Sequence, residues 1–460
     1  MSTRLSKILL VLCLSAGGCT QYRAMPLSQP AVERSLAAPA PNDLRVEARS
    51  IKHPLLKPVP FVDMQGLTPD QAAVLAVLAN PSLRAARDER NIAAAQLLQA
   101  GILPNPQLSF GEDYPYGGAL QGAVTASAVG LNWDVTQLIS HDAKIRAAQA
   151  QSASIDLSVA WQEWQTAQAA KTAVYDLASV RSQLALAKEI DSHLAQNLSV
   201  IRQAVDQHER TLLDLSAAEA ASVDAHAAVL NQQHDEEDQR LALNKALGLA
   251  PDAIVTIDPG IVLPDSVAVP SAAELLAGLE DRRLDLLALR LGYQNQEQTL
   301  RAAVLEQFPK INIGFNRQRD DTNVQSVGFA VTLDLPIFDR NQGTIAAETA
   351  TRQKLFDEYV QRVFEARYDV FTALDDLNSI SAQIAAAENV VPSLQRLSDF
   401  YREALNRGNV DVLSYYTAVN NLAQKQLDIL KLKQELMDNV VALELATGEY
   451  MPASAAAEKK

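Results

Sequence analysis

Two stretches of this chain decide its fold: LASVRSQLALAKEIDSHLAQNLSVIRQAV at residues 177–205 and LNSISAQIAAAENVVPSLQRLSDFYREAL at residues 377–405. Apolar residues recur in the first stretch at alternating intervals of three and four, the heptad pattern of helices that pack along one seam. Adding 200 to each position gives the same pattern, with only Asp191 and Ser398 out of character. The positions are Leu177, Val180, Leu184, Ala187, Asp191, Leu194, Leu198, Ile201 and Val205, and then Leu377, Ile380, Ile384, Ala387, Val391, Leu394, Ser398, Tyr401 and Leu405.

The same offset of 200 continues outside these stretches. It relates Leu213 to Leu413, Leu230 to Leu430, Gly248 to Gly448 and Asp134 to Asp334. A repeat of this length indicates a tandem duplication, so each half is expected to have the same layout.

Each half is predicted to contain one long helical hairpin. The first helices run over about 142–205 and 342–405; at 1.5 Å per residue such helices reach roughly 95 Å. The second helices, about 213–247 and 413–447, return after a short turn. Antiparallel hairpins of this length favour a coiled-coil assembly over a globular domain.

Ahead of each long helix the apolar period changes from helical to alternating. This predicts strands at about 106–114 and 124–135 in the first half, and at about 309–317 and 324–335 in the second. Four aromatic residues on the apolar face are predicted to contact lipid, namely Phe110, Trp133, Phe315 and Phe329. A half-buried soluble sheet is the alternative interpretation.

The first 18 residues form a predicted signal peptide, with basic Arg4 and Lys7, a short apolar run and Gly17-Gly18 before Cys19. This arrangement resembles the lipobox of bacterial lipoproteins, which implies lipidation at Cys19 and delivery to the outer membrane. An ordinary secretory signal with a chance cysteine is the alternative. Because Cys13 and Cys19 are the only cysteines, no disulfide is expected in the remaining chain.

A membrane barrel built from several copies follows from these predictions. The mature chain has no apolar segment of 18 or more residues that could form a spanning helix. Only a closed barrel satisfies the backbone of strands in lipid. Four strands are too few, since small barrels need about eight, so the copies must pool their strands.

Composition disfavours several function classes. With 40 Lys and Arg against 55 Asp and Glu, the net charge is −15, which disfavours nucleic acid as a partner. The six histidines show no metal-ligand spacing, and the cluster at residues 234–238 is better interpreted as a solvated helix face. No catalytic motif is present, so no enzyme activity, cofactor or metal site is predicted.

Taken together, residues 65–450 resemble the TolC-type outer-membrane factor family. The residues that carry the resemblance are NPSL at 80–83, PNPQLS at 104–109, LPIFDR at 335–340 and the stretch from Tyr401 through Gly408 to Leu413. The resemblance implies an α+β membrane protein. Three protomers would share a twelve-stranded barrel, below which a barrel of helical coiled coils projects into the periplasm. Its partners would be outer-membrane lipid, a periplasmic adaptor protein and an inner-membrane pump.

By this resemblance the helical turns form the periplasmic tips. The residues expected to dock the adaptor are His208, Leu212, Leu213, Arg407, Gly408, Val412 and Leu413. Three acids near the tips, Asp206, Asp214 and Asp411, are candidates for a ring of carboxylates at the aperture; the alternative is that each is a helix cap or surface charge. The first tip has His208 where the second has Gly408, so it is expected to dock less typically.

The predicted organisation is a signal peptide at 1–18, a lipid anchor and extended strap at 19–64, repeats at 65–250 and 251–450, and a flexible tail at 451–460. The predicted function is a passive efflux duct, and the alternative is a lipid-anchored periplasmic adaptor or scaffold. The stretch from Asn91 to Pro115 resembles heavy-metal ducts more than drug ducts, while the cargo itself stays open.

Overall fold

The computed structural model describes residues 21–36, 41–60, 66–118 and 121–450. Cys19, the predicted signal peptide and the predicted tail therefore lie outside the described residues. The chain divides into two units, Met1–Ala38 and Pro39–Lys460. Of the described elements, helix α2 (Gln29–Leu36) belongs to the first unit, and the others belong to the second.

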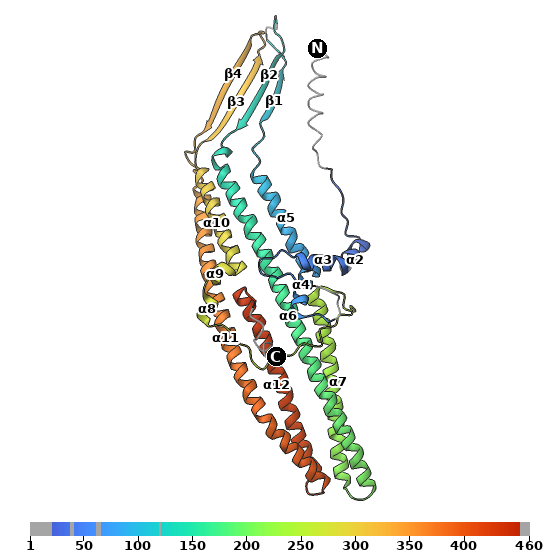
Figure 1. Cartoon of the computed structure of the whole chain (residues 1–460). Helices are drawn as coiled ribbons and strands as arrows, with labels where there is room; N and C mark the ends of the chain where they lie inside the picture. Colours follow the sequence, from blue (N-terminus) through green and yellow to red (C-terminus); the bar gives the residue numbers. More distant parts are fainter. Residues whose placement is uncertain (1–20, 37–40, 61–65, 119–120, 451–460) are drawn as a thin grey trace. The chain divides into compact units, whose positions relative to one another are not determined.

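The second unit contains the two repeats, each with short leading helices, a strand pair and a long hairpin (Figure 1). After α3 (Pro41–Ser50), the first repeat comprises α4 (Pro69–Ala79), α5 (Ser82–Ala100), β1 (Gln107–Asp113), β2 (Ala126–Asp134), α6 (Gln137–Asp206) and α7 (Leu212–Leu247). The second comprises α8 (Ala272–Leu276), α9 (Leu279–Arg282), α10 (Leu284–Leu305), β3 (Lys310–Arg319), β4 (Gln325–Asp334), α11 (Gln342–Asn406) and α12 (Val412–Thr447).

The long helices α6 and α11 have 70 and 65 residues, which corresponds to roughly 100 Å of helix. Helix α6 begins at Gln137, before the predicted start near Asp142. The local reason is a hydrogen bond of 2.9 Å from the backbone N–H of Thr136 to the Asp134 carboxylate, which turns the chain directly from β2 into the helix.

The two repeats bury the same positions. In the first, Leu177 of α6 packs in a cluster with Leu243 of α7, and both are fully buried. In the second, Leu377 of α11 packs in the corresponding cluster with Leu443 of α12. The heptad seam therefore joins the helices of each hairpin, which confirms the predicted duplication.

All four described strands form one antiparallel sheet in the order β1-β2-β3-β4. The central pair β2–β3 joins the repeats, with Leu131 opposite Phe315. Strands β1 and β4 each have one neighbour. The predicted fold class of long helical hairpins with four strands per chain is confirmed.

Among the described residues, no helix combines the length and the apolar character needed to cross a membrane. The long hairpins pack through one seam on each helix, and α11 also keeps large apolar side chains exposed, among them Phe356, Phe364 and Phe371.

Candidate functional site

The sheet has one apolar face that runs across all its strands. Cross-strand partners lie on the same face, and the register places Leu108, Leu131, Phe315 and Phe329 in a single row. Phe110 and Trp133 lie on this face as well, because side chains two residues apart in a strand point the same way. The four aromatic residues singled out in the sequence therefore share one face.

Three of these four side chains are open to the surroundings. Phe110, Phe315 and Phe329 are exposed by 69%, 51% and 70%. Trp133 is half-buried, and its indole N–H donates to the Pro104 carbonyl at 2.8 Å. Contact with lipid remains a prediction for the first three, whereas Trp133 also ties the sheet to the segment before β1.

The opposite face is small and polar. Glycines there leave room for a neighbouring polar side chain to lie flat: a Cβ at Gly130 would come within 2.6 Å of Ser109 Oγ, and one at Gly328 within 2.3 Å of Asn316 Oδ1. The sheet therefore has one apolar face and one polar face that is compatible with water.

The turns at the hairpin tips have the same backbone geometry in both repeats. His208 and Gly408 both adopt left-handed conformations, with φ of 59° and 75°. The matching hydrogen bonds run from Glu209 N to Ala204 O at 2.8 Å and from Asn409 N to Ala404 O at 2.9 Å. The first tip has no glycine at this position, so its turn is less favourable in energy. Its backbone nevertheless follows the same path as the second tip.

We expect His208→Gly to stabilise the folded chain by about 1 kcal/mol, because a residue with a Cβ pays about 1–2 kcal/mol in this conformation. Gln207→Gly is the matched control, since Gln207 has φ of −87° and gains nothing from glycine. Chemical denaturation followed by circular dichroism measures both. A His208→Gly protein no more stable than the wild type would contradict this account of the turn.

The predicted docking residues differ in exposure. Leu212, Leu213 and Leu413 are exposed by 73%, 79% and 67%, and Arg407 is exposed as well. Val412 is only 1% exposed and packs in a cluster that contains residues of both hairpins. The prediction that Val412 is a surface residue is therefore wrong: it supports the tip from inside, because the first turn of α12 rests against the other hairpin.

Two of the three candidate aperture acids cap helices. Asp214 forms a capping box with Thr211 at the start of α7. Asp411 accepts the backbone N–H of Ser414 at 2.6 Å, and this hydrogen bond lowers the pKa of the Asp411 carboxyl. Asp206 is exposed at the end of α6. The role of these acids in a ring stays a prediction, and capping is the role that the geometry gives Asp214 and Asp411.

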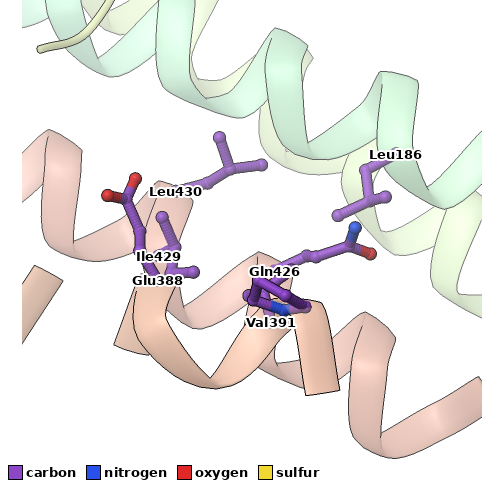
Figure 2. Close-up of a pocket in the computed structure, with 7 residues that line it drawn as sticks. Leu186, Glu388, Val391, Gln426, Ile429 and Leu430 are labelled. Atoms are coloured by element: carbon purple, nitrogen blue, oxygen red, sulfur yellow. The ribbon is translucent and has the colours of Figure 1, made fainter. Parts of the chain in front are cut away.

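The two hairpins of the chain meet at two levels. At the tips, Arg210 donates to the Leu405 carbonyl, and the Tyr416 hydroxyl donates to Asn197 Oδ1 at 2.6 Å. Further along, Ser179 of α6 donates to the Leu430 carbonyl of α12. Between these levels lies an open groove of about 430 Å³ (Figure 2), lined by Leu186, Glu388, Val391, Pro392, Gln426, Ile429 and Leu430.

A buried ion pair joins the repeats near the middle of the unit. Lys171 of α6 and Glu444 of α12 are 5% and 3% exposed, and Lys171 Nζ lies 2.6 Å from Glu444 Oε2. The same ammonium lies 4.8 Å from the ring centroid of Tyr450, which packs edge-on against Trp164. These contacts hold α6 of the first repeat against the end of the second.

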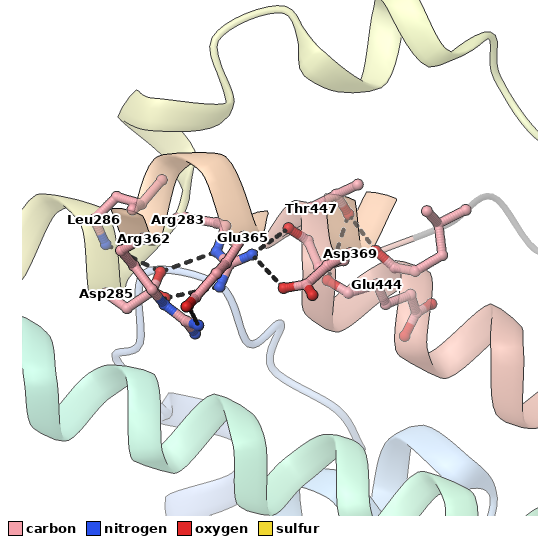
Figure 3. Close-up of polar contacts among 10 residues, drawn as sticks. Arg283, Asp285, Leu286, Arg362, Glu365, Asp369, Glu444 and Thr447 are labelled. Carbon is pink, nitrogen blue, oxygen red and sulfur yellow. Dashed lines mark hydrogen bonds and ion pairs between the residues drawn. The ribbon is translucent and has the colours of Figure 1, made fainter. Parts of the chain in front are cut away.

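A second buried cluster fixes the beginning of α10 (Figure 3). Arg283, 1% exposed, donates to Asp285 at 2.7 Å and to the Ala446 carbonyl at 3.2 Å. Arg362 donates to the same carboxylate at 2.8 Å. Burial raises the pKa of Asp285, but the hydrogen bonds and charges of the two arginines outweigh it and keep that pKa below its usual value.

The segment after α3 is held against α6 by His53. Its Nδ1 accepts the backbone N–H groups of Leu55 and Leu56, both at 3.0 Å, so Nε2 carries the proton and donates to the Ala160 carbonyl at 2.9 Å. Burial lowers the pKa of His53 and favours this neutral form. Nearby Glu163 is buried and pairs with Arg87 at 2.7 Å.

The residues from 21 to 36, 41 to 60, 66 to 118 and 121 to 450 contain no group of three or more His, Cys, Asp or Glu side chains placed to hold a metal ion. The features with functional character are instead surfaces: the two-faced sheet, the exposed leucines of the tips and the long helices between them.

Comparisons with known proteins agree with this geometry. The family model for outer membrane efflux proteins matches residues 275–449, most of the second repeat. Since the structure repeats the same hairpin in the first half, both halves have the layout of this family. The second repeat of the chain is thus similar in sequence to outer membrane efflux proteins.

The relatives of this chain are distant in sequence. It is 20% identical to the cobalt-zinc-cadmium resistance protein CzcC of Cupriavidus metallidurans, over 79% of this chain and 86% of that protein. It is 21% identical to toxin and drug export protein A of Aggregatibacter actinomycetemcomitans and 22% identical to the probable outer membrane lipoprotein SilC of Salmonella typhimurium, each over 58% of this chain. The matches span 60% and 59% of those two proteins, less than two thirds of their length.

Solved structures of efflux channels have the same fold. CusC superimposes with a TM-score of 0.72 at 19% identity, over 94% of this chain and 99% of the other. VceC of Vibrio cholerae superimposes with a TM-score of 0.71 at 17% identity, over 83% and 96%. At these identities the likeness establishes the fold.

Sequence reasoning missed several buried and half-buried polar groups, among them the half-buried Asp438. Burial and, to a smaller extent, the negative charges of Asp176 and Glu435 together raise the pKa of Asp438 to about 7. An unfolded Asp ionises near 4. Between about pH 4 and pH 7 the folded chain therefore keeps a proton that the unfolded chain has lost, so this group makes stability fall as pH rises through that range.

We expect Asp438→Asn to remove this decrease of stability with rising pH. The variant should therefore become more stable than the wild type as the pH rises from 4 to 7, and it should keep this advantage above pH 7. Asp224→Asn, which changes an exposed carboxyl on α7, is the control and should leave the pH profile unchanged. Denaturation midpoints measured at pH 4, 5.5, 7 and 8.5 give the comparison. If the denaturation midpoints of Asp438→Asn and of the wild type change in parallel with pH, the proposed effect of Asp438 is refuted.

Proposed function

We propose that this chain is the outer-membrane duct of a tripartite efflux system. In this proposal three copies pool their sheets into one barrel, and exported solute passes through without a catalytic step. The long hairpins reach into the periplasm, where exposed Leu212, Leu213 and Leu413 dock an adaptor protein that connects the duct to an inner-membrane pump. Cys19 is the proposed lipid anchor.

One observation carries the proposal: a four-stranded sheet with an apolar row across every strand, a small polar opposite face and two strands that each have one neighbour. In a soluble protein such a face would be covered, and here Phe110 and Phe329 are exposed by 69% and 70%. Sheets from several copies that join edge to edge would put this face in lipid and the polar face around water.

Neighbouring residues of β4 provide the test. Phe329→Arg places a charge on the apolar face, which costs about 2–4 kcal/mol at the middle of a bilayer, so binding of the protein to liposomes in a flotation assay should fall. Ala330→Arg places the same charge on the polar face and should leave flotation intact. Equal flotation of the two variants would favour the adaptor or scaffold alternative, which has no use for a lipid-facing sheet.

For cargo, we propose metal cations. The support is the net charge of −15 and the similarity to CzcC, a cobalt-zinc-cadmium resistance protein whose match covers 79% of this chain and 86% of its own. Cells that carry the duct with its own adaptor and pump should tolerate higher cobalt, zinc or cadmium than cells without the duct. Protection against organic toxicants alone would point to the other cargo class, as the name of toxin and drug export protein A suggests for that relative.

A further inference from the structure

Two arginines lie on the apolar face of the sheet. Alternate residues of a strand point the same way, so the side chains of β3 on this face are Ile311, Ile313, Phe315, Arg317 and Arg319. A charge on the lipid side of a barrel is unfavourable at the middle of the bilayer and nearly neutral at its edges. The polar face would have accepted both arginines without this penalty, so their place on the apolar face needs a reason.

The two arginines mark the outer edge of the apolar band. From Ile311 to Arg317 the strand advances six residues, which is about 20 Å, and the apolar band of a membrane barrel is about 25 Å tall. Arg319 lies one step further along the strand. The hairpin ends of the sheet lie away from the helices (Figure 1). In the proposed duct, this edge therefore lies at the outer leaflet.

The neighbouring strands change character at the same level. Arg317 lies between Val129 of β2 and Val327 of β4. Arg319 lies in the next row of this face, between a serine and a glutamine, Ser127 and Gln325. The face thus passes from apolar to polar side chains between the two arginines.

Both guanidinium groups point toward the outer end of the sheet. Arg317 Nη2 donates to Gln325 Oε1 at 3.2 Å, and Arg319 Nη2 donates to the Thr125 carbonyl at 2.7 Å. Gln325 begins β4, and Thr125 directly precedes β2, so both acceptors lie at the hairpin ends. The apolar stems therefore run along the sheet while the charges reach its edge.

The two charges are not neutralised by the part of the chain that the structure describes. There, neither Arg317 nor Arg319 forms an ion pair, and their hydrogen bonds go to a neutral amide and a backbone carbonyl. Arg319 Nε is buried and has no hydrogen-bond partner. The protein thus leaves two positive charges and several N–H donors of this edge available to an anion.

The nearby acids are engaged elsewhere. Glu112 of β1 lies in the same row as Arg319 but two strands away, about 10 Å, and accepts the Tyr114 hydroxyl at 2.6 Å. Asp320 follows Arg319 directly, and its carboxylate accepts the backbone N–H of Val324 at 2.9 Å within its own turn. The local charge at the two arginines is therefore positive.

We propose that Arg317 and Arg319 bind a phosphate group of lipopolysaccharide, the phosphorylated glycolipid of the outer leaflet. This inference rests on the proposed function and adds a lipid-binding site to it. The planar guanidinium donates two parallel hydrogen bonds to phosphate oxygens. Residues two apart in a strand are separated by about 7 Å, so both groups can reach one headgroup. The acyl chains of the same lipid then lie along the apolar rows of the sheet.

Charge favours this lipid over an ordinary phospholipid. A phosphate monoester, as in lipopolysaccharide, carries about −1.5 to −2 near neutral pH. The phosphodiester of a phospholipid carries a single negative charge. Two adjacent guanidinium groups match the monoester, whereas a diester would leave one positive charge at the lipid surface unmatched.

Binding of fluorescently labelled lipopolysaccharide to the full chain, purified in detergent and stripped of lipid, tests the site. Arg317→Gln combined with Arg319→Gln should bind at least about tenfold more weakly than the wild type, because two charge-assisted contacts are lost. The matched control is Lys310→Gln combined with Arg301→Gln, which removes two exposed positive charges on the polar face and on α10. It should bind as the wild type does. Circular dichroism should show equal helix content in all three proteins.

Two other lipids identify the group that is bound. Lipopolysaccharide from which the phosphates have been removed should bind the wild type as weakly as intact lipopolysaccharide binds the double arginine variant. Phosphatidylglycerol, which has a phosphodiester, should bind the wild type more weakly than lipopolysaccharide does. Equal binding of phosphatidylglycerol and lipopolysaccharide would overturn the assignment, because it would show attraction to any anionic lipid.

Failure of this site and failure of the proposed function give different results. If the wild type floats with liposomes and conducts ions, yet the double arginine variant binds lipopolysaccharide as tightly as the wild type, the site is wrong and the proposed function stands. If the wild type neither floats nor conducts, the sheet does not lie in lipid and the proposed function fails together with the site.

Discussion

Lys171→Met is expected to lower the free energy of unfolding by about 3–5 kcal/mol, the usual effect of leaving one charge of a buried pair without its partner. Lys171 and Glu444 are 5% and 3% exposed, so water cannot replace the lost contact. The substitution keeps the volume of the side chain and removes only its charge. Chemical denaturation of the purified protein measures the loss.

Two variants make this result specific. Lys171→Met combined with Glu444→Leu removes both charges and should recover most of the stability, because two apolar groups need no ionic partner. Lys144→Met breaks the ion pair of Lys144 with Glu306, whose side chains are 46% and 41% exposed, and should cost at most about 1 kcal/mol. Equal losses for Lys171→Met and Lys144→Met would show that burial of the pair has no energetic consequence.

Gly248→Ala is expected to destabilise the fold by about 2–5 kcal/mol. Gly248 ends α7 with φ of 72°, where a Cβ costs about 1–2 kcal/mol. The added Cβ would also lie 2.4 Å from the Cα of Asn80 and 2.7 Å from Cδ of Pro81, so the start of α5 must shift, which typically costs about 1–3 kcal/mol more.

Gly408→Ala separates these two causes. Gly408 has φ of 75°, and no atom lies within 4 Å of an added Cβ. It should therefore lose only the backbone part, about 1–2 kcal/mol. The difference between the two variants measures the close contact of α7 with the chain at Asn80. If Gly248→Ala loses less stability than Gly408→Ala, the close contact at Asn80 has no energetic cost and this explanation is contradicted.

The architecture was predictable because its signals are local and occur twice. The heptads of α6 and α11 and the alternation in β1 to β4 each specify an element from neighbouring residues, and a counterpart in the other repeat supports each element.

The buried charges were not predictable in this way. Lys171 and Glu444 are 273 residues apart, and their counterparts Phe371 and Asn244 carry no charge, so neither distance nor repeat links them. Val412 was misassigned because periodicity places it on α12 without showing that the other hairpin lies against its first turn. The capping role of Asp214, in contrast, follows from its spacing to Thr211.

Single-channel recording with the purified wild-type protein in a planar bilayer tests the central claim most directly, namely that copies pool their four-stranded sheets around a water-filled passage. The account predicts discrete conductance steps that favour cations, from a preparation with the mass of three chains. A preparation that inserts no conducting unit and keeps the mass of one chain in lipid would contradict it.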